Sequence, residues 1–395
     1  MQKKKLFIII SIILVLAAAA GIIYFIFSDR GYKTAVLKSD FDINTKVTSD
    51  FIISNGELVT ANDIGVLGLN GKGESNWEVK VPFTNPVIKS SGRYFVVGDI
   101  EGKAVLLFKD NKLQWQSDFE YKVRSVDVNS SGIVTVVHGD NQYKAVVSVL
   151  EAEGGVDGKG KIRFSKSINE SYVMNAISAP SSTTAFINSV NTDAGKTKSI
   201  FSFVNLNAGE TFSSIEIDDN MFPIVYINKD DILIAANNTS IMTFSNIKNS
   251  DKISDGKKII WEKKENNAYL LSAELCQNES IAAAFGSGNS GIFSTTGQTQ
   301  IKIFSVNGEE KASFDVKGTV RRIDSGDNII AISTDNDVFF YSMAGELMYE
   351  YNAPANISKV LFYNKREAVV VTKKNVNVIK AENKNDNASE TKGGN

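Results

Sequence analysis

The chain has 395 residues, enough for two or three ordinary domains or for one large closed all-β fold. A formal net charge of -2 provides no basic field for nucleic acid, so we expect no nucleic-acid partner. The only cysteine, Cys276, excludes an internal disulfide, and the only histidine, His138, excludes a zinc site built from several histidines.

The N-terminus carries a basic tail followed by a long apolar segment. Three lysines within residues 1–5 precede residues 6–27, which contain no charge. As a helix this segment would span about 33 Å at 1.5 Å per residue, enough to cross a hydrocarbon core of about 30 Å. Because the lysines precede the segment, residues 1–5 are expected in the cytoplasm and the body of the chain outside the cell membrane. The sequence therefore predicts a single-pass signal anchor over 6–27 and a short linker over 28–31.

A cleaved signal peptide is the alternative for this segment. The alanines at 17–20 are small residues of the kind that signal peptidase accepts. Cleavage there would leave the apolar residues 22–27 at the new N-terminus, and no nearby cysteine could carry a lipid. An uncleaved anchor is therefore favoured.

After the anchor, helical periodicity nearly disappears, and short runs of β-branched and aromatic residues alternate with polar turns. One recurring unit is a tight hairpin, as in "VRSVDVNSSGIVTVVHGDN" from Val123. The other is a strand, a Gly or Asn turn and a strand with an aromatic residue, as in "KAVLLFKDNKLQWQSDF" from Lys103. Joined, the two units form a four-stranded meander that repeats every 40–45 residues or so, the period typical of β-propeller blades.

We identify inner triplets of strands that begin near Thr45, Pro86, Val123, Tyr172, Phe222, Leu270, Val320 and Ile357. The last triplet lacks a fourth strand, because residues 382–395 form a polar tail that is expected to be disordered. Residues 32–40 ("YKTAVLKSD") can supply this strand from the N-terminal side. The sequence therefore predicts an all-β, eight-bladed β-propeller of four-stranded antiparallel blades over 32–381, with seven blades as the alternative.

Each outer strand is expected to carry an aromatic residue that packs between neighbouring blades. In "GVLGLNGKGESNWEVKV", residues 65–81, Gly71 and Gly73 are expected to allow the turn with positive φ before Trp77. The predicted wedges are Trp77, Trp115, Phe212, Trp261, Phe314 and Tyr349.

The meander also predicts which loops share a face of the ring. If residues 32–40 form an outer strand, the face that carries the turns between third and fourth strands lies closer to the membrane. The insertions at 151–161 and 246–257 belong to that face, whereas the long loops at 188–198 and 286–300 belong to the opposite, distal face. Loops on rigid scaffolds often carry function, so we expect a protein or cell-envelope partner on the distal loops.

Catalytic motifs are weak throughout the chain. "GSGNSG" at 286–291 matches the G-x-G-x-x-G pattern, but a β-rich segment follows it where dinucleotide binding needs a helix, so no nucleotide is expected. His138 has no G-x-S-x-G serine to serve and is expected to be structural or exposed. Cys276 has no adjacent cation and is expected to be a small buried apolar residue.

The paired aspartates are interpreted as turn residues, because aspartate hydrogen-bonds to local backbone in turns and no complete calcium loop is present. We therefore assign no catalytic, cofactor-binding or metal-binding residue, expect no cofactor, and do not expect an enzyme. These pairs are Asp218 with Asp219, Asp230 with Asp231, and Asp335 with Asp337.

The hairpins "LGLNGKGESNWEVKV", "LLFKDNKLQWQSDF" and "FYSMAGELMYEYN" resemble the repeats of pyrroloquinoline-quinone-type (quinoprotein-like) β-propellers. The resemblance covers most of residues 40–380 and implies the fold. Quinoprotein dehydrogenases use adjacent cysteines, a calcium site and a catalytic aspartate, and no residue here is assigned to these roles. The combination of anchor and propeller resembles uncharacterised membrane-anchored propeller proteins of Gram-positive bacteria.

The leading hypothesis is a membrane-anchored, extracytoplasmic propeller that acts as a non-catalytic binding or scaffold module for a protein or cell-envelope component. The alternative is an envelope polysaccharide lyase or hydrolase that uses acidic and tyrosine residues at the propeller channel. A deep funnel with clustered Asp, Tyr and Arg side chains would favour the enzyme, and a flat mouth with apolar distal loops would favour the scaffold.

Overall fold

The computed structural model describes residues 32–43, 45, 48–244, 259–264, 268–287 and 298–383. The predicted cytoplasmic tail (1–5), anchor (6–27) and linker (28–31) lie outside these residues, as do the insertion at 246–257 and residues 288–297 of the second distal loop. Among the residues that the structure describes, no helix combines the length and the apolar content that crossing a membrane requires.

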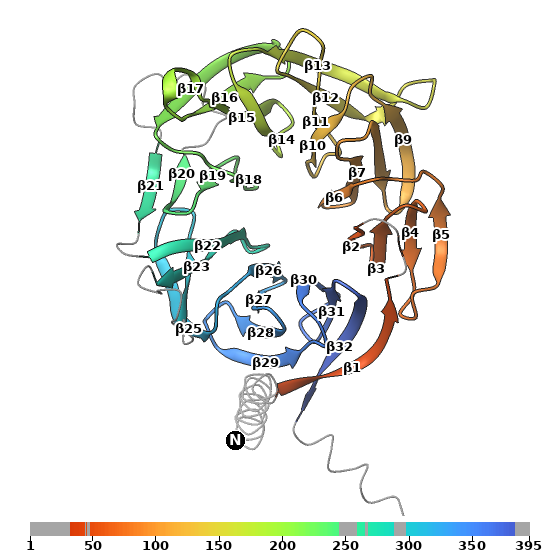
Figure 1. Ribbon diagram of the computed structural model, residues 1–395, viewed down its shortest axis with the longest axis vertical. Coiled ribbons are helices and arrows are strands. Elements are labelled where there is room, and N and C mark those ends of the chain that lie inside the picture. Colours follow the sequence, from red (N-terminus) through yellow and green to blue (C-terminus); the bar gives the residue numbers. More distant parts are fainter. Residues whose placement is uncertain are drawn as a thin grey trace, which may run out of the picture.

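Groups of four antiparallel strands are arranged radially around a central axis (Figure 1). We call the four positions of a group A, B, C and D, from the strand nearest the axis outward. The first four groups are β2 (Asp50–Ser54), β3 (Glu57–Ala61), β4 (Val66–Leu69), β5 (Ser75–Val79); β6 (Pro86–Ser91), β7 (Tyr94–Asp99), β8 (Ala104–Lys109), β9 (Lys112–Asp118); β10 (Val123–Val128), β11 (Val134–His138), β12 (Ala145–Gly154), β13 (Gly160–Ile168); and β14 (Tyr172–Ser178), β15 (Thr184–Asn191), β16 (Lys198–Asn205), β17 (Glu210–Asp218).

The later groups repeat this pattern, and each A strand again lies nearest the axis (Figure 1). They are β18 (Ile224–Ile227), β19 (Leu233–Ala236), β20 (Ser240–Phe244), β21 (Ile259–Lys264); β22 (Ala268–Leu275), β23 (Ile281–Ser287), β24 (Gln298–Phe304), β25 (Glu310–Lys317); β26 (Arg322–Gly326), β27 (Ile329–Ser333), β28 (Asp337–Ser342), β29 (Leu347–Asn352); and β30 (Ile357–Phe362), β31 (Glu367–Thr372), β32 (Asn375–Asn383) with β1 (Tyr32–Asp42) as the fourth strand.

The N-terminal strand joins the two ends of the chain. Strand β1 runs antiparallel to β32, from the pair Tyr32 and Asn383 to the pair Asp42 and Asn375. It also pairs in parallel with β29 at Thr34 and Glu350, so the last two groups share one eight-stranded sheet. Strand β32 ends at Asn383, and residues 384–395 of the predicted tail lie outside the described chain.

The core is divided into hydrophobic clusters that lie between neighbouring groups of strands. Phe95 and Leu106 of the second group, for example, pack with Val59 of the first. The ring closes in the same way, because Phe51 and Leu58 of the first group pack with Val369 of the last. Stacking against a neighbour on each side buries both faces of a sheet that could not bury them alone.

The predicted aromatic wedges are confirmed as contacts between groups. Trp115 on β9 is only 1% exposed, and its indole Nε1 donates a 3.0 Å hydrogen bond to the Glu151 carbonyl of the next group. Tyr349 on β29 is also buried and donates a 3.1 Å hydrogen bond to the Lys365 carbonyl of the last group. Trp77, Phe212, Trp261 and Phe314 pack against the corresponding clusters between the other groups.

In some turns between C and D strands, glycine lets an aromatic ring of the neighbouring group approach the backbone closely. Gly73 has φ +79, and a Cβ there would lie 2.6 Å from the Phe41 ring on β1. Gly345 has φ +82, and its Cβ would lie 2.7 Å from the Phe314 ring on β25. The prediction of positive φ is therefore right for Gly73 but wrong for Gly71, which does not adopt it.

The ends of the strands define two faces of the ring. Face 1 carries the A–B and C–D turns and the start of β1, because Tyr32 pairs with the last residue of β32. Face 2 carries the B–C and D–A connections. Of the two distal loops predicted for face 2, the first is shorter than expected: β15 extends to Asn191 and β16 begins at Lys198, with one 3₁₀ turn, Asp193–Gly195, between them.

Candidate functional site

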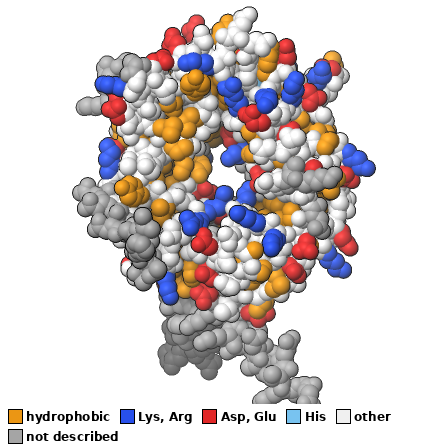
Figure 2. All heavy atoms as spheres, viewed as in Figure 1, with side chains coloured by type: hydrophobic (Ala, Val, Ile, Leu, Met, Phe, Trp, Pro, Cys, Tyr) orange, Lys and Arg blue, Asp and Glu red, His pale blue; other side chains and the backbone are white. Residues whose placement is uncertain are grey.

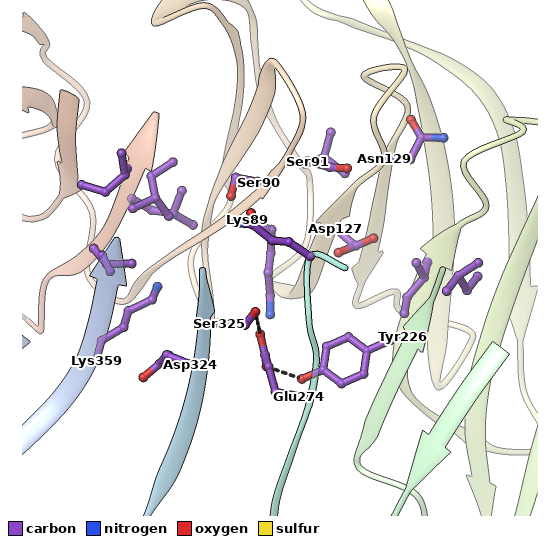
Figure 3. A pocket seen from close by; sticks show the side chains of 18 of the residues that line it. Lys89, Ser90, Ser91, Asp127, Asn129, Tyr226, Glu274, Asp324, Ser325 and Lys359 are labelled. Carbon is purple, nitrogen blue, oxygen red and sulfur yellow. Dashed lines mark hydrogen bonds between the residues drawn. The ribbon is translucent and has the colours of Figure 1, made fainter. Parts of the chain in front are cut away.

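A pocket of about 560 Å³ occupies the central channel, a volume within the usual range of ligand sites (Figure 3). Its walls come from A strands all around the ring, and it reaches the A–B turns near Asn129 and Gln277, which belong to face 1. Figure 2 shows the open axis with basic side chains along part of its rim. Lining residues from successive A strands include Ile52, Lys89, Asp127, Ile177, Tyr226, Glu274, Asp324 and Lys359.

Polar side chains on the A strands hold neighbouring groups together at the channel. An A strand is the inner edge of its sheet, so the backbone N–H groups on that edge need partners. Asp50 Oδ2 accepts a 2.8 Å hydrogen bond from the Ile88 N–H of the next group. Asp324 Oδ2 accepts one of 3.1 Å from the Val360 N–H in the same way. These carboxylates therefore have a structural role in addition to facing the channel.

Two of the basic side chains at the pocket are already in ion pairs. Lys359 Nζ lies 2.9 Å from Asp50 Oδ1, and both side chains are partly buried. Arg322 Nε lies 2.5 Å from Asp324 Oδ1, and Asp324 is buried. Burial raises the pKa of Asp324, and the Arg322 guanidinium opposes that rise. Each cation thus has a carboxylate partner within the ring itself.

Glu274 on β22 has a different environment, because its hydrogen-bond donors are neutral. The Tyr226 hydroxyl donates to Glu274 Oε2 at 3.0 Å and the Ser325 hydroxyl to Oε1 at 3.4 Å (Figure 3). Burial raises the pKa of Glu274 to about 7, and the nearby Asp324 carboxylate adds to the rise. Burial also raises the pKa of Tyr226 well above its usual value, with Glu274 contributing.

Asp127 on β10 faces the same pocket (Figure 3). Its side chain is partly exposed to the channel, yet the surrounding walls desolvate it and raise its pKa to about 7. The Lys89 ammonium and the Val128 backbone N–H oppose this rise. In the part of the chain that the structure describes, Asp127 forms no ion pair within 4.0 Å.

The pKa directions of these groups bear on the chemistry of a lyase or a glycosidase. A tyrosine that acts as a base needs a lowered pKa, whereas that of Tyr226 is raised. A pair of glycosidase carboxyls needs one protonated acid and one ionised partner, but the pKa values of Asp127 and Glu274 move in the same direction.

The two singular residues of the sequence lie away from this pocket. His138 ends β11, where Nδ1 lies 2.8 Å from the Gly139 carbonyl and Nε2 3.0 Å from the Ser148 hydroxyl. Burial lowers the pKa of His138 below its usual value, which favours the neutral ring. Cys276 is 2% exposed, and burial raises its pKa to about 12, which leaves the thiol unreactive. The burial predicted for Cys276 is confirmed, and His138 is partly buried at the end of its strand.

The aspartate pairs lie at strand ends and in the adjoining turns: Asp218 ends β17 and Asp337 begins β28, whereas their pair members lie outside the strands. Asp219 and Asp231 adopt φ of 56° and 57°, and Asp335 pairs with Arg321 at 2.9 Å. Over the described ranges, no group of three or more His, Cys, Asp or Glu side chains is arranged to hold a metal ion. Only Gly286 and Ser287 of the GSGNSG segment are described, and both belong to strand β23.

Sequence reasoning did not identify the residues of the pocket. A signal was nevertheless present: charged residues interrupt the otherwise apolar A strands, as in "PVIKSS" with Lys89, "VRSVDV" with Asp127 and "AYLLSAEL" with Glu274.

Solved structures share the fold of this chain at low sequence identity. BamB from Moraxella catarrhalis is 11% identical with a TM-score of 0.54, and the match covers 88% of this chain and 100% of that chain. The C-terminal WD40 domain of Sif2 is 12% identical with a TM-score of 0.61, covering 88% and 99%. Chaetomium thermophilum Sqt1, bound to the N-terminus of ribosomal protein L10, is 10% identical with a TM-score of 0.59, covering 88% and 99%. The chain is therefore a β-propeller.

No curated protein matches the sequence. A family model does match it, over residues 28–381, and its description is "Family of unknown function (DUF5711)". Because this match spans most of the chain, the protein belongs to the DUF5711 family.

Proposed function

We propose that the protein is a single-pass membrane protein whose propeller stands outside the cytoplasm and binds a protein or a cell-envelope component without catalysis. The observation that carries this proposal is the channel pocket. A rigid ring presents paired charges, hydroxyls and amides from strands around the whole axis, while the titratable groups do not divide into an acid and a base. The shared fold with propellers such as Sqt1, which is bound to a peptide segment, is consistent with a binding module.

The start of β1 supports an orientation for this site. Face 1 carries both the pocket and Tyr32, and residues 28–31 separate Tyr32 from the predicted anchor. Four extended residues reach about 14 Å at most. In our proposal the pocket therefore opens toward the membrane surface, and the partner is reached from that side. The face 2 loops at 188–198 and 286–300 are a second proposed surface for binding a partner.

Site-specific crosslinking in the native cell envelope tests this site. A photo-crosslinking residue in place of Gln277, at the pocket, should capture a partner, whereas the matched replacement of Lys196 on the face 2 loop should not. Capture only from position 196 would contradict the pocket as the binding site. Capture from neither position would contradict the binding function at both proposed surfaces.

Protease treatment of intact cells tests the topology separately. The polypeptide beyond residue 383 should be digested while the cell remains closed. Complete protection would contradict the extracytoplasmic location.

An envelope polysaccharide lyase or hydrolase is the second candidate. The cluster of Tyr226, Glu274 and Arg322 in one pocket is the kind of funnel that favours it. If it is correct, the purified protein should depolymerise envelope polysaccharide, and Glu274→Gln should abolish that activity. The raised pKa of Tyr226 makes this the weaker proposal.

Two finer points of classification belong to the same proposal. We infer eight blades, by counting the eight-stranded sheet as β26–β29 and as β30–β32 completed by β1. We also infer that the repeats are of the quinoprotein-like type and that the protein is similar to uncharacterised membrane-anchored propeller proteins of Gram-positive bacteria.

A further inference from the structure

Two carboxyl groups of the channel pocket differ from the others, because they form no close ion pair with a lysine or arginine of the described residues. Of the three basic side chains that line it, Arg322 and Lys359 are each within 2.9 Å of a carboxylate of their own, Asp324 and Asp50. Glu274 and Asp127 have no ion pair within 4.0 Å among the described residues. Lys89 is the remaining cation and faces Asp127. When Asp50 is counted, the channel has one more carboxyl group than it has cations. The carboxyl groups are those of Asp50, Asp127, Glu274 and Asp324, and the cations are Lys89, Arg322 and Lys359.

The surroundings of Glu274 show what it lacks. The Tyr226 hydroxyl donates a hydrogen bond to one carboxylate oxygen and the Ser325 hydroxyl to the other. Both oxygens therefore have a hydrogen-bond donor, but neither donor carries a positive charge. Arg322 also faces it but is held by Asp324, whose own charge repels that of Glu274. The Glu274 side chain is partly buried. A desolvated carboxylate without a counter-ion is unfavourable, and its neutral form is favoured unless a cation arrives.

An anionic ligand fits this pocket less well. It would need free cations, and two of the three are already neutralised by Asp50 and Asp324. Releasing either lysine or arginine from its carboxylate would also leave Asp50 or Asp324 unpaired, although both accept backbone hydrogen bonds that join neighbouring groups. Binding of an anion would therefore disturb contacts that join neighbouring groups, whereas binding of a cation leaves both ion pairs intact.

We propose that the channel pocket binds a ligand through an ammonium or guanidinium group, which enters from face 1 and lies between Glu274 and Asp127. This inference rests on the proposed binding function and names the chemistry of its ligand. The apolar walls at Ile52, Ile88 and Ile177 suit the methylene stem that carries such a group, as in a lysine or arginine side chain. A free amine offers the same chemistry, and the two sources are separated by the test.

Calorimetry with the full chain in detergent micelles tests the proposal. The probes are the peptide acetyl-Gly-Lys-Gly-amide, the same peptide with norleucine or glutamate in place of lysine, and free putrescine. We expect saturable binding of the lysine peptide and none of the norleucine or glutamate peptides. Putrescine binding equal to that of the lysine peptide assigns the ligand to free amines, and weaker putrescine binding assigns it to a polypeptide side chain.

Variants connect binding to the two carboxyl groups. Glu274→Gln and Asp127→Asn should each weaken binding of the lysine peptide about tenfold, which is the scale of one lost charge contact. Glu101→Gln is the matched control, because Glu101 is an exposed carboxylate in a surface pair with Lys122 and should change nothing. Thermal unfolding of each variant shows whether it is folded, and the two pocket variants provide independent readings if one is not.

Proton exchange gives a second readout that a purely structural role would not produce. A bound cation favours the ionised carboxylates, so binding near neutral pH should release protons, and affinity for the lysine peptide should rise between about pH 6 and about pH 8. Glu274→Gln should reduce this rise.

Preference for the glutamate peptide would overturn the proposal, and so would the absence of saturable binding of either cationic probe. Unchanged lysine binding in both pocket variants would overturn it as well. If position 277 still captures a partner in the cell envelope, the binding function stands and only the ligand chemistry is wrong. If neither 277 nor 196 captures a partner although lysine peptides bind, the ligand chemistry stands and the proposed partner in the cell envelope is wrong.

Discussion

The junctions between neighbouring groups of strands differ between the channel and the outer wall. At the channel, polar side chains on A strands bridge the groups, as Asp50 does to Ile88 and Asp324 does to Val360. At the outer wall, the bridging residues on D strands are aromatic, as with Trp115 and Tyr349, and they are almost fully buried. The same strand pairing thus supports one boundary made of hydrogen bonds and another made of apolar packing.

This difference separates stability from recognition. Apolar area removed from water is the main favourable term in folding, so the outer boundary should supply most of the stability of the ring. Desolvated carboxyl groups without an ion pair contribute little or oppose folding, so in our proposal Asp127 and Glu274 serve recognition, whereas Asp50 and Asp324 also join neighbouring groups. The predictions below test this division from the largest expected effect to the smallest.

Trp115→Ala should be the most damaging of these changes. It removes a fully buried ring and its hydrogen bond to Glu151, and the loss in free energy of unfolding should be about 3–5 kcal/mol. Leu113→Ala on the same strand is the control, because Leu113 is 40% exposed and should cost under about 1 kcal/mol. Urea unfolding measures both, and equal losses would contradict the wedge role of Trp115.

Gly345→Ala should be more destabilising than Gly56→Ala. Both glycines have positive φ, so both alanines should lose about 1 kcal/mol from backbone strain. Only at Gly345 would the new Cβ also meet a ring, 2.7 Å from Phe314, whereas nothing lies within 4 Å at Gly56. The additional loss at Gly345 should be about 1–3 kcal/mol in urea unfolding. Equal losses would indicate that the contact between the Gly345 backbone and the Phe314 ring does not require glycine.

Glu274→Gln should stabilise the protein in alkaline solution. The pKa of Glu274 is near 7 when folded and about 4.5 as a free side chain, so between these values the unfolded chain loses a proton that the folded chain keeps. The free energy of unfolding therefore falls as pH rises through this window and stays low above about pH 7. The glutamine variant avoids this loss and should gain about 1–3 kcal/mol at pH 8 but little at pH 4.

The pH profile of unfolding, measured for Glu274→Gln and for the exposed control Glu101→Gln, checks this expectation. A glutamine variant less stable than the wild type at alkaline pH would mean that the ionised Glu274 already has a favourable environment without a ligand. That result would remove the reason to seek a cation for the pocket.

Tyr349→Phe should have the smallest effect of the four. It retains the stacked contact with Phe340 at 4.2 Å between ring centroids and removes only the hydrogen bond to Lys365. The loss should be about 0.5–1.5 kcal/mol in urea unfolding. A loss as large as that of Trp115→Ala would show that polar contacts at the outer wall matter as much as packing.

The repeated all-β architecture could be predicted from the sequence because its signals are local. Outer-strand aromatics such as Trp115 and Trp261 recur with the period of a four-stranded unit, and turn residues mark its ends. Strand starts were less accurate where turns are irregular: the first A strand begins at Asp50 rather than near Thr45, and β18 begins at Ile224 rather than at Phe222.

The pocket could not be predicted in the same way, because it depends on assembly of the whole ring. Lys89, Asp127, Glu274 and Lys359 are far apart in the sequence and meet only at the axis. Single charged residues within apolar strands carry no local motif. Loop length predicted the binding surface on the long distal loops of face 2, whereas this pocket reaches the A–B turns of face 1.

Partner capture by the Asp127→Asn/Glu274→Gln double variant, compared with the wild type in crosslinked native envelopes, tests the central claim most directly. The account predicts that the variant unfolds at the same temperature or a higher one in neutral solution and captures much less partner. Undiminished capture by a folded double variant would contradict the claim that the channel carboxyl groups exist for recognition.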